Sequence, residues 1–251
     1  MQKTFGKGSR VLIVGATSGI ARELARIFAA RGFDLVLAAR DTQELQLLAA
    51  DLQIRGAKYK ISVQTLAFSA LDYDAHADFW NRCGEVDGVV CCFGWLDAEM
   101  EARSDWNKCR EMLEINFNAN VSLLNLVAND FEARKHGFIA VLSSVAGDRG
   151  RSGNYIYGAA KSGLSTYAEG LRQRLFGAGV SVTTIKPGPV DTGMTWGMDK
   201  LPLMVPPEKV AFDIFSGLAR RADVVYSPAP WRLIMAVMRI VPARIWKKLK
   251  F

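Results

Sequence analysis

Residues 11–21, VLIVGATSGIA, decide the fold class that the sequence predicts. Four aliphatic residues, 11–14, are followed by a short turn that begins at Gly15. The turn leads into a segment with the periodicity of a helix. Gly15 permits a tight turn, Gly19 lets the backbone approach a phosphate, and the N-terminus of the following helix attracts negative charge. A turn of this composition could simply join a strand to a helix. Its place after the first strand of a βαβ unit instead predicts dinucleotide binding.

Short aliphatic runs continue to alternate with helix-length segments along the chain, as in βαβ units. Several runs are apolar throughout, which is typical of strands covered by helices on both faces. The sequence therefore predicts an α/β fold, a Rossmann-type doubly wound parallel sheet of about seven strands. We expect strands at 11–14, 35–39, 62–68, 86–92, 138–142, 180–185 and 224–226, and helices near 20–31, 43–55, 75–82, 105–134, 154–176 and 207–221.

The expected domain organisation is simple. With 251 residues, the chain suits one large α/β domain better than two. No internal repeat or linker rich in Gly, Ser or Pro interrupts it. We expect a dinucleotide-binding catalytic domain over 1–230, with a substrate lobe near 190–221, followed by an apolar and basic C-terminal segment over 231–251.

The cysteines and histidines indicate neither a metal site nor a disulfide framework. The four cysteines have no metal-ligand spacing, and the adjacent Cys91 and Cys92 lie in an apolar run, where we expect small buried side chains. His76 and His136 belong to no motif and are expected at the surface. No export signal is expected from the first residues, so the cytoplasm is the predicted compartment.

The net charge of +7 is concentrated at the C-terminal end. From Arg220 onward, eight basic residues face a single acid, Asp223, so residues 1–219 are formally neutral. A neutral body with a basic tail argues against a general nucleic-acid-binding protein. It indicates a local role for the tail.

The end of the second predicted strand bears on the choice of cofactor. A carboxylate there would bind the adenosine ribose and repel a 2′-phosphate, whereas Ala39 is neutral and Arg40 offers a guanidinium suited to a phosphate. Ser18 could add a hydroxyl. Arg40 could instead pair with Asp41 or face solvent. The sequence favours NADP(H), with NAD(H) as the alternative.

The strongest chemical signal is Tyr157, followed four residues later by Lys161. On a helix this spacing places the phenol and the ammonium on one face. A free tyrosine has a pKa of about 10, and we expect the nearby cation to lower that pKa towards neutrality. Ser143 and Ser144 follow the fifth predicted strand, where a hydroxyl could polarise a substrate carbonyl at the ligand-binding edge of the sheet.

These motifs together resemble the classical short-chain dehydrogenase/reductase family, and the resemblance covers the chain up to about residue 195. Residues 15–21 look like the cofactor loop of that family, and 186–192, KPGPVDT, like the loop that meets the nicotinamide. The implied catalytic tetrad, with Ser144 rather than Ser143 at the family's spacing, is Asn116, Ser144, Tyr157 and Lys161. The implied cofactor-binding residues are Gly15, Thr17, Ser18, Gly19, Ile20, Arg40, Gly94, Lys161, Pro187, Gly188, Val190 and Thr192.

The reaction that the resemblance implies is hydride transfer between the nicotinamide and a ketone or secondary alcohol. Tyr157 would donate the proton, Ser144 would hydrogen-bond the carbonyl oxygen, and Lys161 would also hold the nicotinamide ribose. Asn116 would support a proton-relay water. Long helices pair between subunits in this family, so a homodimer or homotetramer is expected.

Three positions depart from the family's pattern. Ala21 replaces the usual third glycine, and Ser69 lies where a carboxylate normally meets the adenine. The sequence CCFG at 91–94 replaces the usual Asn-Asn-Ala-Gly, so Gly94 is kept but the asparagines that brace the sheet are absent. None of these changes touches the proton or hydride chemistry.

Two segments are candidates for substrate contacts. The loop 147–155, GDRGRSGNY, lies between the expected catalytic serine and tyrosine. Its Arg149 and Arg151 could clamp a phosphate or polar head group, or could face solvent or another subunit. Met194 and Trp196 belong to an apolar stretch that could close over a substrate or form the core of its own lid.

The motif GDRGR at 147–151, Phe93 before Gly94, and the apolar, basic tail resemble a narrower group of bacterial reductases. That group acts on a 2-keto sugar carried by a polyprenyl phosphate and made by a flavin-dependent oxidase partner. A lipid-linked carbonyl substrate is therefore one hypothesis. A soluble reductase of small 3-oxoacyl or xenobiotic ketones is the alternative. A catalytically silent dinucleotide-binding regulator is a third hypothesis, which the complete tetrad disfavours.

The tail predicts contact with a membrane surface rather than a span. Its apolar stretch, 233–238, lies between Arg232 and Arg239, and a transmembrane helix needs about 20 mostly apolar residues. Trp231 and Trp246 bracket the segment, and its basic side chains would be attracted to anionic lipid. This predicts peripheral contact with the inner face of the membrane. The tail could instead pack over the substrate pocket or against another subunit.

Overall fold

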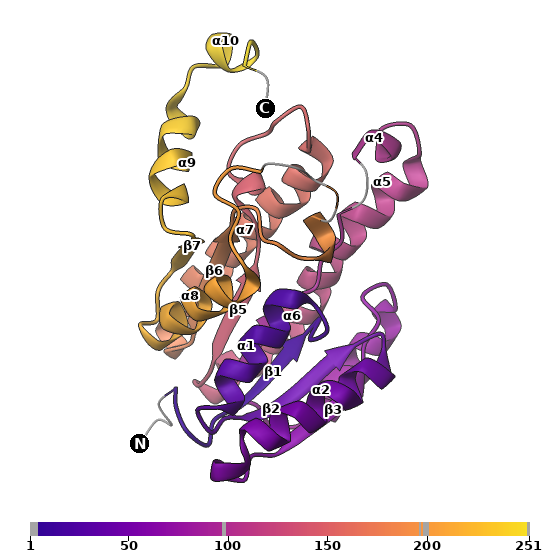
Figure 1. Ribbon diagram of the computed structural model, residues 1–251, viewed down its shortest axis with the longest axis vertical. Coiled ribbons are helices and arrows are strands. Elements are labelled where there is room, and N and C mark those ends of the chain that lie inside the picture. The colour runs from indigo at the N-terminus through magenta and orange to yellow at the C-terminus, as the bar shows by residue number, and fades with distance from the viewer. Residues whose placement is uncertain (1–4, 97–98, 196, 198–200, 250–251) are drawn as a thin grey trace.

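The computed structural model describes residues 5–249 apart from 97–98, 196 and 198–200. Its centre is a seven-stranded sheet in the order β3-β2-β1-β4-β5-β6-β7, with every pairing parallel (Figure 1). This confirms the expected Rossmann-type fold, and each expected strand is present. The strands are β1 (Arg10–Val14), β2 (Asp34–Ala39), β3 (Val63–Ala67), β4 (Gly88–Cys91), β5 (Phe138–Leu142), β6 (Ser181–Pro187) and β7 (Val224–Ser227).

Helices cover both faces of the sheet because successive strand residues point to opposite faces. Val11 and Ile13 of β1 pack towards α1, α2 and α8, whereas Leu12 and Val14 pack towards α3, α6 and α7. The first three helices are α1 (Gly19–Ala29), α2 (Thr42–Arg55) and α8 (Pro207–Ala219). The other three are α3 (His76–Cys83), α6 (Ala119–Arg134) and α7 (Tyr155–Leu175). Short 3-10 turns lie at Ala57–Tyr59, Tyr73–Ala75, Val145–Gly147, Phe176–Ala178 and Gly193–Thr195.

The parallel strands place the expected site residues at one edge of the sheet. The carboxyl ends of β1, β4, β5 and β6 lie together, so the turns that follow them share that edge. These turns contain Gly15, Gly94, Ser144 and Gly188. Ligands of open α/β sheets bind outside this edge, where the strand order reverses between β1 and β4.

The prediction of a single long helix over 105–134 is wrong. α5 (Trp106–Leu113) and α6 are joined by one π-helical turn, Glu114–Asn118, and a separate short helix, α4 (Glu99–Ala102), precedes them. The Nδ2 group of Asn116 donates to the carbonyl oxygen of Met112 (2.9 Å), which an α-helix would pair with the backbone N–H of residue 116. The side chain therefore competes with the α-helical pattern where the wider turn occurs.

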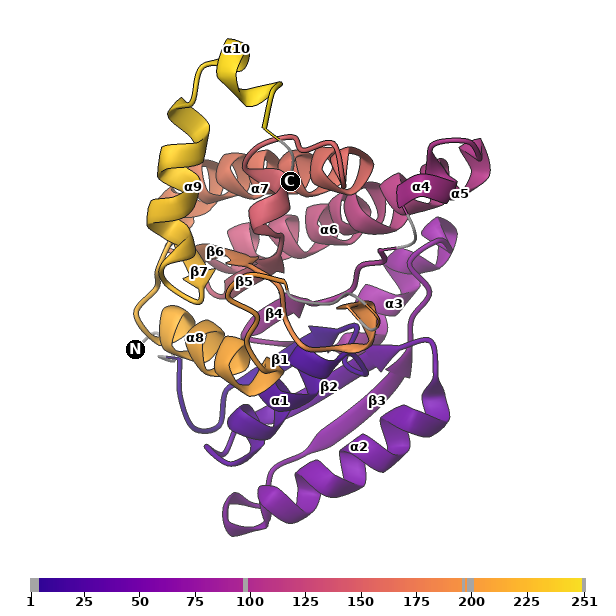
Figure 2. The same ribbon diagram turned by 45° about the horizontal axis from the view of Figure 1, so that its top comes forward.

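The C-terminal part of the chain packs on the core. α8 packs beside α1 in the core. After β7, α9 (Trp231–Ile240) and α10 (Ala243–Trp246) lie at the outer edge of the molecule (Figure 2). Trp231 and Met235 are buried against Val145, so α9 is part of the packed structure. No helix in the described ranges is long and apolar enough to cross a membrane.

The buried polar residues include one that was expected at the surface. His76 is only 1% exposed, because its ring stacks on Phe68 and its two nitrogens hydrogen-bond Ser122 Oγ (2.9 Å) and the Ser69 carbonyl oxygen (3.3 Å). His136 is half-buried and pairs with a neighbouring carboxylate. Cys91 and Cys92 are buried, as expected.

Candidate active site

The turn after β1 has the geometry of a phosphate-binding loop. Gly15 has a φ of +78°, and a Cβ there would lie 2.7 Å from the backbone nitrogen of Phe93, so glycine is required. Ser18 precedes α1, but its side chain makes no cap hydrogen bond, and the first turn of α1 holds no acid. The first-turn N–H groups are therefore available to an anion. These features fit a dinucleotide pyrophosphate held by Gly15, Ser18 and the start of α1.

The other residues expected at this loop have defined places. Gly19 faces the loop after β6, since a Cβ on it would lie 3.1 Å from Cγ2 of Thr192. The carbonyl oxygen of Thr17 accepts from Arg22 Nε (2.8 Å), and Ile20 packs in the core. The loops after β1 and β6 thus approach each other at the edge of the sheet.

Arg40 lies at the end of β2 and lines a cavity of about 330 Å³ together with Ser69, Asp72 and Arg82. The suggested pairing of Arg40 with Asp41 is not found within the described residues, because Asp41 caps α2 by accepting from the Glu44 N–H (2.9 Å). The Arg40 guanidinium is exposed. It is therefore free to contact a phosphate at the adenosine end of a dinucleotide.

Ser144 and Tyr157 are brought together at the carboxyl edge of the sheet. The Ser144 hydroxyl lies close enough to the phenol of Tyr157 to lower its pKa, and it accepts from the Ala146 N–H (3.1 Å). The neighbouring Ser143 points elsewhere: its hydroxyl lies 2.9 Å from the Lys161 carbonyl oxygen and is buried. Of the two serines, only Ser144 is placed to act with the tyrosine.

The pKa of Tyr157 differs from the expectation drawn from spacing. Burial raises the pKa of Tyr157 to about 12, and the hydrogen bond from Ser144 offsets this only in part. The Nζ atom of Lys161 lies 5.6 Å from the centre of the phenol ring and donates to the Leu142 carbonyl oxygen (3.0 Å). Lys161 therefore does not contribute to the pKa of Tyr157 in this structure, and burial determines the direction of the shift.

Asn116 and Lys161 meet at Gly94. A Cβ on Gly94 would lie 2.8 Å from Asn116 Oδ1 and 3.1 Å from Lys161 Nζ, so this position needs the smallest residue. Asn116 is fully buried and held by the backbone of Trp95, donating to its oxygen (2.6 Å) and accepting from its nitrogen (3.2 Å). All four residues of the expected tetrad thus lie at one edge of the sheet.

The loop after β6 packs against α9. A Cβ on Gly188 would lie 2.0 Å from Nε1 of Trp231, so this glycine admits the indole of α9. Pro187 ends β6, and Val190 is buried and bridges to Val205. The carbonyl oxygen of Val190 accepts from the Thr192 hydroxyl (3.4 Å).

The two arginines expected at the substrate do not act as a pair. Arg149 donates to the carbonyl oxygens of Met238 (2.9 Å) and Arg239 (2.6 Å), and its guanidinium lies 4.5 Å from the centre of the Trp246 ring. Arg149 is thus engaged by the C-terminal segment, because α9 ends beside its loop. Arg151 keeps a buried Nε atom without a partner in the described part of the chain. Trp196 and the side chain of Met194 lie outside the described residues.

Sequence reasoning missed Asp148, whose side chain is buried at this edge. Its carboxylate accepts from Lys186 Nζ (2.5 Å) and Tyr226 Oη (2.8 Å), and also from Arg239. A lone acid between Gly147 and Arg149 carries no spacing signal, because its partners come from three distant segments.

A family model described as short chain dehydrogenase matches residues 9–201. The chain belongs to the short-chain dehydrogenase family. An uncharacterized oxidoreductase of Mycobacterium tuberculosis (strain ATCC 25618 / H37Rv) is 37% identical over 243 residues, which cover 95% of this chain and 96% of that protein. An uncharacterized oxidoreductase of Streptomyces coelicolor is 34% identical over 249 residues, which cover 97% of each chain.

A solved short-chain dehydrogenase from Sphingobium yanoikuyae, in complex with NADPH, matches with a TM-score of 0.80 and 26% identity. The match covers 94% of this chain and 97% of that one. Short-chain dehydrogenases bind a nicotinamide dinucleotide and interconvert carbonyls and alcohols. The chain is therefore an oxidoreductase of this kind.

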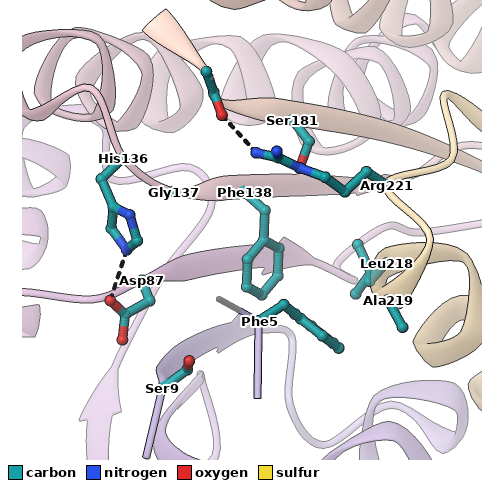
Figure 3. A pocket seen from close by; sticks show the side chains of 11 residues that line it. Phe5, Ser9, Asp87, His136, Gly137, Phe138, Ser181, Leu218, Ala219 and Arg221 are labelled. Atoms are coloured by element: carbon teal, nitrogen blue, oxygen red, sulfur yellow. Dashed lines mark hydrogen bonds and ion pairs between the residues drawn. The ribbon is translucent and has the colours of Figure 1, made fainter. Parts of the chain in front are cut away.

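A second cavity of this short-chain dehydrogenase lies at the opposite, amino edge of the sheet. It has a volume of about 220 Å³ and is lined by Phe5, Phe138 and Arg221, with His136 paired to Asp87 (2.9 Å) (Figure 3). The amino ends of β4, β5 and β6 border it, so the strands separate it from the tetrad. The cavity is thus separate from the carboxyl edge that holds the expected tetrad.

We expect Lys161→Met to stabilise the fold near neutral pH and to lose that advantage in alkali. Burial lowers the pKa of Lys161 to about 8, whereas an unfolded lysine titrates at about 10.4. Below the folded pKa, the native state holds a proton that burial disfavours. Above it, the native state releases that proton before the unfolded chain does, so wild-type stability rises relative to the variant between about pH 8 and 10.4.

Urea unfolding of both proteins at several pH values measures this effect. The difference should be about 3 kcal/mol near pH 7 and should nearly vanish above about pH 10.4. A difference that stays constant over the whole range would show that Lys161 is not destabilised by burial.

Proposed function

We propose that this short-chain dehydrogenase is an NADPH-dependent ketone reductase in which Tyr157 is the proton donor. The observation that carries the proposal is the proximity of the Ser144 and Tyr157 hydroxyls at the ligand-binding edge, with the buried Lys161 on the same helix as Tyr157. A dinucleotide-binding regulator would not need a hydroxyl pair of this kind. The complete set therefore favours an enzyme over a sensor.

The proposed roles follow from the hydrogen bonds of each residue. The bound nicotinamide supplies the hydride. Ser144 accepts from the Ala146 N–H, so its own hydrogen can reach the substrate carbonyl oxygen. Tyr157, with its pKa raised to about 12, stays protonated near neutral pH and can donate to the developing alkoxide. Lys161 would hold the nicotinamide ribose, and Asn116 is fixed by Trp95 beside it.

The proposal is tested by following NADPH oxidation with a panel of ketones. The panel contains a 3-oxoacyl thioester, a bulky xenobiotic ketone and a polyprenyl-phosphate keto-pentose. Reduction of at least one class by the wild type supports the proposal. Stable NADPH binding without turnover on any ketone or, in the reverse direction, on any secondary alcohol would favour the regulator.

Arg40→Asp is expected to reverse a preference for NADPH over NADH. The exposed guanidinium lines the cavity at the end of β2, and a charge-assisted contact to the 2′-phosphate contributes about 1.5–3 kcal/mol. The ratio of kcat/KM for NADPH to that for NADH should therefore fall by at least about tenfold. Arg220→Asp, the same charge change at the exposed end of α8, is the control. A wild type that prefers NADH would remove the assigned role of Arg40.

For the substrate, we propose a 2-keto sugar on a polyprenyl phosphate, supplied by a flavin-dependent oxidase. Arg151 lies in the segment of the sequence between Ser144 and Tyr157. It is half-buried, and its Nε atom has no partner among the described residues, which supports an anionic group on the substrate. A soluble 3-oxoacyl or xenobiotic ketone reductase is the second candidate. We also propose a homodimer or homotetramer, as is common in the family, located in the cytoplasm.

The outer face of α9 supports contact with a membrane surface. Leu233, Val237 and Ile240 follow the i, i+4, i+7 spacing of one helix face and are 71%, 52% and 78% exposed. The exposed Lys247 and Lys248 follow in the next segment. Apolar side chains beside lysines suit the inner face of a membrane with anionic lipids.

Flotation with vesicles tests this contact. The double variant Val237→Glu/Ile240→Glu is preferable to a truncation, because Trp231 and Met235 of the same helix are buried in the fold. The wild type should float with anionic vesicles and not with zwitterionic ones, and the double variant should float with neither. Equal partitioning of wild type and variant would remove the membrane contact from the proposal.

A further inference from the structure

Asp148 joins three parts of the active-site edge. Its side chain is only 1% exposed and lies in the loop before α7. The partners of its carboxylate come from different elements: Lys186 is the penultimate residue of β6, Tyr226 lies in β7 and Arg239 lies in α9. One buried carboxylate therefore links the loop after β5, the end of β6 and the C-terminal helix.

The charges of this cluster make its geometry specific. Burial raises the pKa of Asp148, but hydrogen bonds from Lys186 and Tyr226 lower it by more, so the pKa lies below its usual value. The side chain of Lys186 is 8% exposed, which means that its ammonium depends on this carboxylate. A buried network in which the carboxylate has all its donors favours one arrangement of the segments that supply them.

The C-terminal segment also holds the residues that flank Asp148. Arg149 donates to carbonyl oxygens in the last turn of α9, which an α-helix leaves without backbone partners. Trp246 Nε1 donates to the Gly150 carbonyl oxygen (2.9 Å). Val145 packs against Trp231. The segment thus contacts the loop on both sides of Asp148.

The opposite side of the same loop is packed against the helix of the tetrad. A Cβ on Gly147 would lie 2.6 Å from the carbonyl carbon of Lys161, so this part of the loop lies directly on α7. Ser144 begins this stretch. A shift of the loop would therefore move Ser144 relative to Tyr157.

We propose that Asp148 and Arg239 are positioning residues that hold the Ser144 loop against the end of β6. α9 thereby determines the rate of turnover although none of its residues is a reacting group. The expected effect on kcat rests on the proposed reductase function, whereas the expected effect on the position of the Ser144 loop rests only on the contacts described above.

Arg239→Met tests the proposal, because the Arg239 side chain is 49% exposed and its loss leaves no buried cavity. With a ketone that the wild type reduces, kcat should fall by about tenfold or more, since small misplacements of reacting groups have effects of this size. The Kd for NADPH should stay near the wild-type value. Arg239→Lys should restore most of kcat. Arg232→Met, which removes an equal charge from the same helix, is the control and should keep the wild-type kcat.

The double variant Asp148→Asn/Arg239→Met shows whether Arg239 acts through Asp148. Arg239→Met should reduce kcat much less in the Asp148→Asn background than in the wild type. Hydrogen exchange supplies a readout that needs no turnover: Arg239→Met should speed exchange of the amides of 145–150 and leave β1 unchanged. Unchanged kcat and exchange in Arg239→Met, or an equal loss of kcat in both backgrounds, would overturn the proposal. Failure of the reductase function would be distinct: the wild type would reduce no ketone, and loop exchange would still decide the positioning role.

Discussion

Tyr157→Phe is expected to lower kcat by at least about 100-fold while the Kd for NADPH stays near the wild-type value. The substitution removes only the phenolic oxygen. The ring keeps its place in a buried cluster with Met112, Ala146 and Ile156, so the site should keep its shape. The lost hydroxyl is the proposed proton donor and the partner of Ser144, and general acid catalysis contributes about 10²–10⁴-fold. Initial rates and a fluorescence titration with NADPH measure the two quantities.

Tyr167→Phe is the matched control. Tyr167 lies on the same helix, and its hydroxyl donates to Asn125 Oδ1 (2.7 Å) away from the tetrad. This variant should keep wild-type turnover. A Tyr157→Phe variant that turns over within about tenfold of the wild type would exclude Tyr157 as the proton donor.

Asp148→Ala is expected to lower the free energy of unfolding by about 3–5 kcal/mol. The substitution leaves the Lys186 ammonium, which is 8% exposed, and the Tyr226 hydroxyl without their acceptor. Removing one partner of a buried ion pair has an effect of this size because the remaining charge is desolvated and unpaired. Asp148→Asn, which keeps one acceptor oxygen, should lose less. Urea unfolding gives the comparison.

The same experiment at acid pH checks the cause. The pKa of Asp148 lies below its usual value, so its carboxylate stabilises the fold above about pH 4 and loses this effect as pH falls further. The stability gap between wild type and Asp148→Ala should therefore narrow in acid. Asp130→Ala removes an acid that pairs with Arg134 on one helix face and should lose less than about 1 kcal/mol. Equal losses in the two variants would mean that burial does not set the strength of the Asp148 network.

The features that sequence reasoning predicted well are those determined by short segments. The strands were identifiable because short, continuous aliphatic runs are typical of parallel strands that are covered by helices on both faces. Parallel strands share one carboxyl edge, so the motifs that follow these strands were expected to lie close together in space. Helical spacing was enough to place Tyr157 and Lys161 on one face. The place after β5 left Ser143 and Ser144 as candidates, and the spacing of the family favoured Ser144.

The features that it missed depend on packing between distant segments. The donors to Asp148 come from β6, β7 and α9, and Arg149 turns to the C-terminus of α9 because that helix ends beside it. The contact between Gly188 and the indole of Trp231 also joins two segments that are distant in the sequence. The pKa of Tyr157 was expected to fall with Lys161 nearby, but burial, which spacing does not reveal, raises it.

Deuterium transfer from NADPH in which both hydrogens at nicotinamide C4 are replaced by deuterium tests the central claim most directly. Wild-type protein is incubated with the labelled cofactor and the ketone panel, and the alcohols are analysed by mass spectrometry. A nicotinamide-dependent reductase with Tyr157 as proton donor should place one deuterium on the carbinol carbon, and the Tyr157→Phe variant should form almost no labelled alcohol in the same time. Alcohol without deuterium, or equal labelling by wild type and variant, would contradict this account.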